Sequence, residues 1–219
     1  MKKILLFVLI FGAGFLFSCN KNKSSQLTVY VVRHAESFKN INPVPDIPKE
    51  KLDSLTPKGI QQAIEIGKAL KNADIVAIYT SPTGRTKETG QIIGKALASP
   101  KNITVSDALI SLNNGKDEKG NANSFEWREA QWAKNIDQKP IDGETMQEGV
   151  ERSVTLVKQN QKKSNGRAIV LVTHGDICAG ILGQVDNTPY ANRFKKYTIP
   201  TGSYKKIVII EDNWFLKTE

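Results

Sequence analysis

Three short runs of apolar, mostly β-branched residues place the strongest limit on how this chain can fold. They occupy residues 27–32, 75–80 and 168–173, and each ends abruptly in polar or charged residues. A strand with one face in water alternates apolar and polar residues, whereas these runs do not alternate. They therefore predict strands that are buried on both faces, as in a parallel sheet covered by helices.

The segments between these runs have helical patterns. Thr56 and Pro57 supply an N-cap and a first-turn proline for one helix, and two more helices are predicted over residues 85–97 and 144–163. Since strands and helices alternate, we expect an α/β fold of three layers, with a mainly parallel central sheet and helices on both faces.

Two segments depart from this alternation. Residues 111–139 are rich in asparagine, glycine and charge and carry Trp127 and Trp132. They are predicted to form an insertion that lines or covers a site. Residues 206–210 are expected to form a final strand that pairs with residues 214–216 as a hairpin at the sheet edge.

The N-terminus has the pattern of an export signal. Lys2 and Lys3 precede an apolar run over residues 4–17, which is shorter than the roughly 20 residues that cross a bilayer as a helix. Residues 16–19, Leu-Phe-Ser-Cys, resemble the lipobox of bacterial lipoproteins, in which the cysteine is lipidated. We therefore expect a lipoprotein signal peptide at 1–18, lipidation at Cys19, a polar tether at 19–26 and one domain at 27–219.

The expected location is thus the cell envelope, with the lipid anchor in a membrane and the domain periplasmic or on the cell surface. The alternatives are a soluble secreted form and an uncleaved membrane-spanning anchor. Removal of residues 1–18 deletes two lysines and no acidic residue, so the formal charge falls from +9 to +7. The lysines are scattered and not interleaved with aromatic residues, so no nucleic-acid partner is expected. With Cys19 lipidated, Cys178 has no intrachain partner for a disulfide.

Both histidines of the chain stand directly after a predicted buried strand. His34 follows the first run and His174 follows the third. Ligands in open α/β sheets bind beyond the carboxyl ends of the strands, so both imidazoles are expected at one edge of the sheet. The alternative for each is a structural histidine that bonds to a backbone carbonyl.

Arginines accompany these histidines at the ends of the strands. Arg33 directly precedes His34, and Arg85 follows the second run. A guanidinium group is always charged and binds phosphate oxygens in a fork, so these arginines predict a phosphate clamp, to which Asn40 could add a neutral donor. Surface salt bridges are expected for the other arginines considered, Arg128, Arg152, Arg167 and Arg193.

Five segments in order resemble the motif series of the histidine phosphatase superfamily. They are Arg-His-Ala-Glu-Ser at 33–37 together with Asn40, and the segments 55–63, 80–89, 143–145 and 173–175. That family also includes cofactor-dependent phosphoglycerate mutases and phosphohistidine phosphatases. The resemblance implies a phosphohistidine intermediate on His34, a phosphate pocket formed by Arg33, Asn40, Arg85 and His174, and neither a metal nor another cofactor.

One position departs from the family pattern. In many members a Leu-x-Glu stretch carries the acid that protonates the leaving group, and here Ser111 stands at that glutamate. Serine cannot supply this proton at neutral pH. Either a nearby carboxyl replaces it, or the substrate has a good leaving group, such as a phosphoramidate or an anhydride. The candidate acids are Asp107, Asp117, Glu118 and Glu126, followed by Glu36 and Glu144, and for each the alternative is a solvated charge.

The function expected from these features is that of a metal-independent phosphatase. It would hydrolyse a phosphate monoester or phosphoramidate of a small molecule or a protein. One alternative is mutase-type phosphoryl transfer, which the export signal disfavours. The other is a catalytically weak module that binds a phosphorylated ligand, which the missing glutamate favours.

Overall fold

The computed structural model describes residues 26–132 and 134–217. The predicted signal peptide, Cys19 and the tether up to residue 25 lie outside these residues. Gln26, which was predicted to end the tether, is instead the first residue of a strand. Among the described helices, none combines the length and the apolar character needed to cross a bilayer.

A sheet of six strands forms the centre of the described domain. Strands β1 to β4 run parallel to one another, whereas β5 pairs antiparallel with β1 and β6 pairs antiparallel with β5, so the sheet is mainly parallel as predicted. The predicted C-terminal hairpin is also confirmed, since β5 pairs with β6. The strand order is β3-β2-β4-β1-β5-β6, with bounds β1 (Gln26–Arg33), β2 (Ile75–Thr80), β3 (Ile103–Val105), β4 (Ala168–Thr173), β5 (Tyr204–Ile210) and β6 (Asn213–Lys217).

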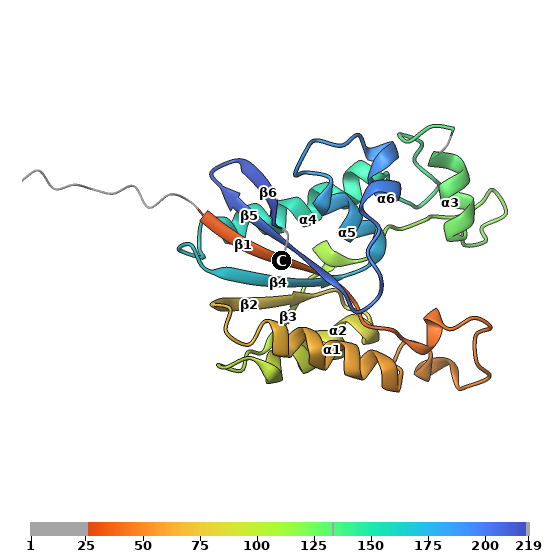
Figure 1. The fold of residues 1–219 in the computed structure, drawn as a ribbon. Helices are drawn as coiled ribbons and strands as arrows, with labels where there is room; N and C mark the ends of the chain where they lie inside the picture. The colour runs from red at the N-terminus through yellow and green to blue at the C-terminus, as the bar shows by residue number, and fades with distance from the viewer. Residues whose placement is uncertain (1–25, 133, 218–219) are drawn as a thin grey trace, which may run out of the picture.

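Helices cover both faces of this sheet, which confirms the three layers (Figure 1). One face carries α1 (Pro57–Ala69) and α2 (Gly84–Ala96), and the other carries α4 (Met146–Gln161), α5 (Gly175–Leu182) and α6 (Tyr190–Tyr197). As predicted, Thr56 caps α1, since its hydroxyl accepts a hydrogen bond from the Gly59 amide at 2.9 Å. The remaining helices are α3 (Phe125–Trp132), within the insertion, and the short 3₁₀ helices η1 (Phe38–Asn40), η2 (Lys49–Lys51) and η3 (Asp107–Leu109).

The central position of β4 explains its unbroken apolar sequence. β4 pairs with β2 on one side and β1 on the other, and all six of its residues are buried. Ile169 and Leu171 belong to the core beneath α4 and α5, whereas Val170 and Val172 belong to the core beneath α1 and α2. Successive side chains of a strand point to opposite faces, so a strand covered on both faces must be apolar throughout.

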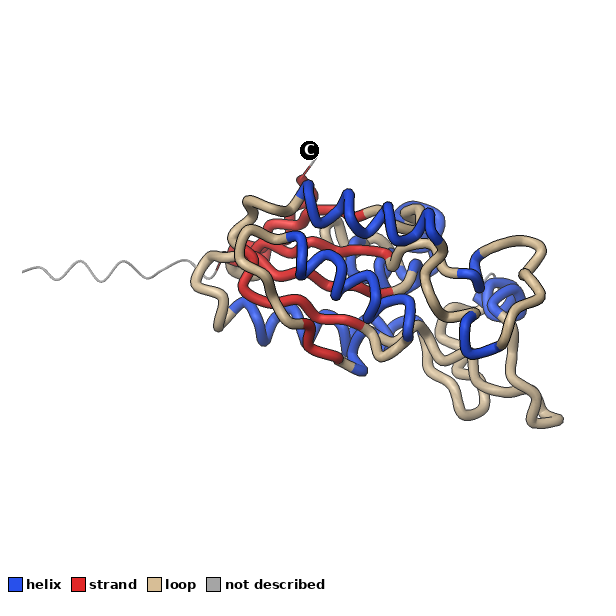
Figure 2. The backbone as a smooth tube through the Cα atoms, turned by 90° about the horizontal axis from the view of Figure 1, so that it is seen from below, coloured by secondary structure: helices blue, strands red, loops and turns tan. Residues whose placement is uncertain are grey.

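The parallel strands bring several loops to one end of the sheet. The chain after β1 and the insertion around α3 project beyond the carboxyl ends of β1, β2 and β4, on opposite sides of the sheet (Figure 1). In the view from below, the longer loops also lie at this end of the sheet (Figure 2). This is the edge at which the sequence places both histidines.

Two of the arginines predicted on the surface are buried instead. The Arg128 side chain is fully buried and its Nη2 donates to the carbonyl oxygens of Asn113, at 2.9 Å, and Glu144. Arg193, 5% exposed, donates to the carbonyls of Thr188 and Gly180. Carbonyl groups buried by loops need donors, and long guanidinium side chains supply them from a distance. The prediction of surface salt bridges was therefore wrong for these two residues.

Candidate active site

His34 lies at the carboxyl end of β1, where the pairing with β4 continues one residue beyond the strand. Its amide donates to the Thr173 carbonyl at 2.9 Å, and its side chain is almost fully buried. The ring nitrogen Nδ1 lies 2.8 Å from the carbonyl oxygen of Ala35. A carbonyl can only accept, so Nδ1 carries the hydrogen and the Nε2 lone pair of the neutral ring remains available.

His174 follows β4 and caps the N-terminus of α5. Its Nδ1 lies 3.1 Å from Arg85 Nη2, and its Nε2 lies 2.9 Å from Ser81 Oγ. Since a guanidinium can only donate, Nδ1 is the acceptor and Nε2 of the neutral ring carries the hydrogen. The centroids of the two imidazoles are 5.3 Å apart. The structure thus brings both histidines to one edge of the sheet, as the sequence predicts.

Arg85 joins the two histidines into one cluster. From the first turn of α2, its Nε donates to His34 Nε2 at 3.1 Å, while its Nη2 bonds to His174. Its side chain is only 14% exposed. A phosphate group placed between the imidazoles would meet two N–H donors of this guanidinium.

Arg33 offers a further donor beside the cluster. Its Nη1 donates to the Ile199 carbonyl at 2.8 Å, whereas its Nε is buried with no hydrogen-bond partner within the described part of the chain. The guanidinium packs on Gly175 so closely that a Cβ there would lie 3.2 Å from Arg33 Cζ. A buried, unpaired donor is costly, roughly 1–3 kcal/mol, and an oxyanion ligand would satisfy it.

Asn40 stands apart from the residues predicted to surround the phosphate. It is exposed, and its Oδ1 accepts hydrogen bonds from the Ser37 amide at 3.0 Å and the Ser37 hydroxyl at 2.8 Å. The described contacts do not join Asn40 to either histidine or to Arg85. Its role in phosphate binding stays a prediction.

Burial and positive charge keep both imidazoles neutral. The pKa of His34 is lowered from 6.5 to about 4, mainly by burial, while the Ala35 carbonyl opposes the shift and Arg85 and Arg33 add to it. Burial also lowers the pKa of His174 strongly, with Arg85 and then His34 as the next causes. A neutral His34 with a free Nε2 lone pair is the form of imidazole that can attack phosphorus.

Asp53 is a member of this cluster that the sequence analysis missed. Its carboxylate forms an ion pair with Arg85 Nη1 and accepts a hydrogen bond from the Gly84 amide at 2.5 Å. Glycine favours this approach, because a Cβ at position 84 would lie only 3.0 Å from Asp53 Oδ2. Nothing in the sequence pattern distinguishes Asp53 from other loop acids, since it stands 32 residues from Arg85.

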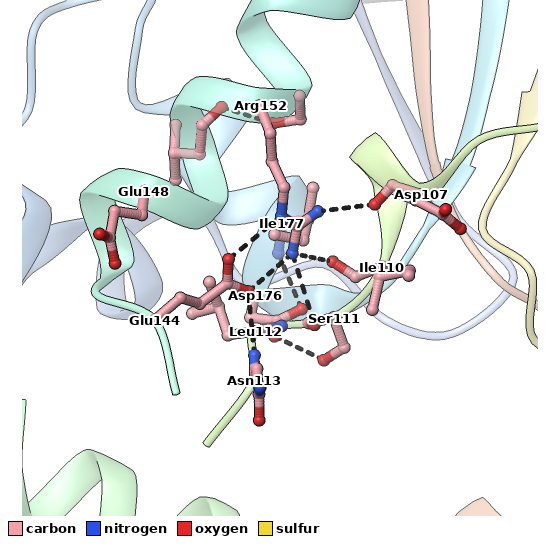
Figure 3. Close-up of polar contacts among 12 residues, drawn as sticks. Asp107, Ile110, Ser111, Leu112, Asn113, Glu144, Glu148, Arg152, Asp176 and Ile177 are labelled. Carbon is pink, nitrogen blue, oxygen red and sulfur yellow. Dashed lines mark hydrogen bonds and ion pairs between the residues drawn. The ribbon is translucent and has the colours of Figure 1, made fainter. Parts of the chain in front are cut away.

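The segment that carries Ser111 is hydrogen-bonded to the two residues Thr173 and Asp176 near His174 in the chain, and Figure 3 shows its contact with Asp176. The Thr173 hydroxyl donates to the Leu109 carbonyl at 2.7 Å, and the Ser111 hydroxyl lies 2.6 Å from Asp176 Oδ2. Residues 109–111 are therefore held by the residues that flank His174 in the chain. The sequence analysis did not predict this role for Asp176.

A cavity of about 590 Å³ borders Ser111. It is lined by residues 110–115 and by Asp107, Glu144 and Arg152, among others. Arg152 shapes this wall, because its guanidinium pairs with Glu144 at 2.8 Å and donates to the carbonyl oxygens of Ala108 and Ile110 (Figure 3). Arg152 is thus partly buried and stabilises the loop through these contacts, so it is not an arginine of the open surface.

No described contact joins the four candidate acids of the insertion region to either histidine or to Arg85. Asp107 is exposed and lines the cavity, whereas Asp117 and Glu118 line a different hollow of about 500 Å³. The pKa of Asp117 is lowered, first by a hydrogen bond from Asn121, and a backbone hydrogen bond lowers that of Glu126. Both carboxylates are therefore ionised at neutral pH and cannot act as acids. Asp107 shares its cavity with Ser111, and no described contact joins any of the four to the Ser111 side chain.

Among the residues that the structure describes, no group of three or more histidine, cysteine or acidic side chains is arranged to hold a metal ion. Cys178 is buried and carries a free thiol, whose pKa burial raises far above its ordinary value. Such a thiol is inert as a nucleophile at neutral pH.

Comparisons with known proteins agree with this geometry. A family model described as "Histidine phosphatase superfamily (branch 1)" matches residues 29–219. The relative "Probable phosphoglycerate mutase GpmB" of Salmonella arizonae is 29% identical over 201 residues, which cover 88% of this chain and 92% of the relative. A protein of the same name from Escherichia coli O139:H28 is 28% identical over the same coverage.

Several similar solved structures carry phosphatase names, and another, from Bacillus anthracis, is named a phosphoglycerate mutase. A mycobacterial glucosyl-3-phosphoglycerate phosphatase in complex with VO3 superposes with a TM-score of 0.68 at 18% identity, covering 88% of this chain and 98% of the other. A phosphoserine phosphatase mutant of Entamoeba histolytica in complex with phosphoserine gives a TM-score of 0.67 at 20% identity, covering 88% and 95%. At these identities the likeness shows the fold.

Proposed function

The chain belongs to the histidine phosphatase superfamily, and from this membership we propose that it is a metal-independent phosphatase that acts through a phosphohistidine on His34. The observation that carries the proposal is the state of His34. Its Nδ1 donates to the Ala35 carbonyl, which directs the Nε2 lone pair toward Arg85, and the lowered pKa of about 4 keeps the ring neutral.

The reaction divides into two displacements. In the first, the lone pair of His34 Nε2 forms a bond to phosphorus while the bond to the leaving group breaks and its electron pair leaves with that group. In the second, a water oxygen attacks phosphorus, the bond to Nε2 breaks, and the water proton passes to solvent. Arg33 and Arg85 donate to the phosphoryl oxygens, and His174 joins them once the negative charge of the phosphate allows its Nδ1 to take up a proton. Fixed donors that stabilise these oxygens supply most of the catalysis in phosphoryl transfer.

Mutase-type transfer is the second candidate function. The relatives at 28–29% identity are named as probable phosphoglycerate mutases, and a mutase would use the same phosphohistidine. The products separate the two activities: a phosphatase releases inorganic phosphate, whereas a mutase returns an isomer of its substrate. The export signal supports the phosphatase, because glycolytic substrates are cytosolic.

The export of this domain is part of the same proposal. Residues 16–19 resemble a lipobox, so we place the domain in the cell envelope, anchored through Cys19 and facing the periplasm or the cell surface. Its substrate there would be a phosphorylated small molecule or protein.

The proposed function is tested by trapping the intermediate. Incubation with labelled p-nitrophenyl phosphate, followed by quenching without acid, should place label on His34, since phosphohistidine is labile to acid. His34→Ala should abolish both the label and the turnover, because the sequence has one other histidine, His174, and its Nε2 is bonded to Ser81. Turnover that persists in His34→Ala would remove the proposed mechanism.

A further inference from the structure

Ser111 is held in a fixed orientation by Asp176, which follows His174 in the chain. Its hydroxyl lies 2.6 Å from Asp176 Oδ2, and the amide of the next residue, Leu112, donates to the same oxygen at 2.8 Å (Figure 3). Asp176 follows His174 by two residues. Thr173, which directly precedes His174, donates a hydrogen bond to the Leu109 carbonyl. The Ser111 segment is therefore bonded to the chain on both sides of His174.

The surroundings of Asp176 determine which way the serine proton points. The Asp176 side chain is buried, and its Oδ1 accepts a third hydrogen bond, from the Ile177 amide at 2.8 Å. Two of the three partners are backbone amides that can only donate, and the first turn of α5 favours a negative charge. Asp176 therefore acts as an acceptor, and the Ser111 hydroxyl donates to it. The Ser111 oxygen then offers a substrate its lone pairs only.

Two other carboxylates near this edge also accept hydrogen bonds from neighbouring donors. Glu36 lies 2.8 Å from Lys58 Nζ and 2.9 Å from the Thr56 hydroxyl, and its pKa is lowered, chiefly by the hydrogen bond from Lys58. Glu144 accepts from Arg152 at 2.8 Å and from the Asn113 amide at 2.9 Å. A cation or donor beside a carboxylate stabilises its ionised form.

Asp53, which pairs with Arg85, completes this set of acceptors. None of these carboxylates contacts an imidazole or Ser111 in the described residues, apart from Asp176. Asp107 lines the cavity beside Ser111, but it is exposed and no described contact joins it to an imidazole. Among the described residues at this edge, no carboxyl is therefore held in contact with the imidazoles, where it could give a proton to a leaving group.

We propose that this site takes phosphoryl donors whose leaving group is a weak base, namely aryl phosphates, acyl phosphates and phosphoanhydrides, and that it discriminates against alkyl phosphate monoesters. The inference rests on the proposed phosphatase function and names its substrate class. In the first displacement the P–O bond breaks, its electron pair stays on the leaving oxygen, and the group departs as a phenolate, carboxylate or phosphate. No proton is transferred in this step.

The test compares leaving groups and asks whether a new acid changes their ranking. We would measure kcat/KM of the full-length protein for a series of substituted phenyl phosphates, for acetyl phosphate, and for glycerol phosphate and phosphoserine as alkyl esters. A positioned acid contributes roughly 10²- to 10⁴-fold. We expect glycerol phosphate and phosphoserine to be turned over at least about 100-fold more slowly than p-nitrophenyl phosphate, with a steep dependence on leaving-group pKa.

Two variants at position 111 provide the matched pair. Ser111→Glu introduces a carboxyl whose proton is retained because Asp176 lies beside it, since a like charge disfavours ionisation. Ser111→Gln introduces a side chain of nearly the same size as that glutamate, but an amide cannot act as an acid. We expect the ratio of alkyl to p-nitrophenyl turnover to rise about 10- to 100-fold in Ser111→Glu, and to stay within a few-fold of wild type in Ser111→Gln.

Three results would overturn the inference. The first is wild-type turnover of alkyl esters equal to that of p-nitrophenyl phosphate. The second is an Asp176→Asn variant that loses alkyl turnover selectively, because Asp176 would then supply a proton through Ser111. This variant and the wild-type series decide the question even where Ser111→Glu fails to fold. The third is equal ratios in the two position-111 variants when both fold.

Failure of the proposed function would look different from failure of this inference. If p-nitrophenyl phosphate turnover requires His34 while alkyl esters react equally well, only the substrate class is wrong. If no ester and no acyl phosphate is turned over and no label reaches His34, both proposals fail together.

Discussion

Arg85 donates a hydrogen bond from Nε to Nε2 of His34, at 3.1 Å, so the nitrogen proposed to attack phosphorus is covered in the structure. The same guanidinium bonds to His174 through Nη2. A phosphoryl group offers anionic oxygens, which are better acceptors than neutral imidazole nitrogens. Its arrival would draw both donors of Arg85 onto oxygen and free the His34 lone pair. Substrate binding and activation of the nucleophile would thus be one event.

The burial of neutral imidazoles makes stability depend on pH. The pKa of His34 is about 4 in the folded chain and 6.5 in the unfolded chain, so between these values the unfolded chain binds more protons. The free energy of unfolding should therefore fall as the pH is lowered from 6.5 towards 4. The contribution of His34 amounts to at most roughly 3 kcal/mol.

Urea unfolding at pH 7.0 and pH 4.5 measures this effect. The control is His34→Gln, which should lose less stability than wild type over this interval, because the variant has no imidazole to protonate at that position. An equal loss in both proteins would show that other groups, such as the ion-paired carboxylates, cause the dependence.

Activity should survive removal of metal ions. The groups that meet at the proposed phosphate site are two imidazoles and two guanidiniums, and positive charge repels a divalent cation. Hydrolysis of p-nitrophenyl phosphate should stay within about two-fold of the untreated rate after dialysis against EDTA. A loss that one particular metal restores would point to a different class of phosphatase.

The sequence predicts the parts of the site that depend on strand order. His34 and His174 each follow an unbroken apolar run, and parallel strands must carry the residues after such runs to one edge. Arg85 follows β2 in the same way, through the N-terminus of α2. The positions of these three side chains are consequences of the buried strands, which are the clearest pattern in the chain.

The parts that the sequence did not reveal depend on contacts between loops. Asp53 reaches Arg85 from a loop before α1, and Asp176 reaches Ser111 across 65 residues of sequence. Such pairs arise from the relative placement of loops, and an acidic residue in a loop has no periodicity that distinguishes it from a solvated charge. The same holds for Arg128, whose burial depends on carbonyl groups that only the folded loops bring together.

The proposed lipid anchor gives a prediction about location. Cys19→Ser removes the thiol that a lipid would modify and leaves the apolar run of residues 4–17 intact. The variant should move from the membrane fraction to the soluble envelope fraction or the medium, or accumulate as an uncleaved precursor of higher mass. Membrane retention of a protein that is processed to the mature mass, without incorporated lipid, would contradict the anchor at Cys19.

Asp53 is predicted to position Arg85 without touching the substrate. Asp53→Asn keeps the size of the side chain but removes the charge that pairs with Arg85 Nη1. Hydrogen bonds between charged groups contribute about 1.5–3 kcal/mol, so kcat/KM should fall roughly 10- to 100-fold. The control is Asp46→Asn, an exposed aspartate in the same loop for which the described residues provide no side-chain partner, and it should stay near the wild-type value.

The pH profile separates positioning from a general loss of structure. The charge of Asp53 raises the pKa of His34, in opposition to burial and the arginines. Without that charge His34 should protonate at still lower pH, so the acid limb of kcat/KM should move to lower pH in Asp53→Asn. Asp53→Glu, which restores the charge, should return this limb towards its wild-type position. A variant that loses activity with an unchanged pH profile, and that Asp53→Glu does not rescue, would assign Asp53 to folding of the loop alone.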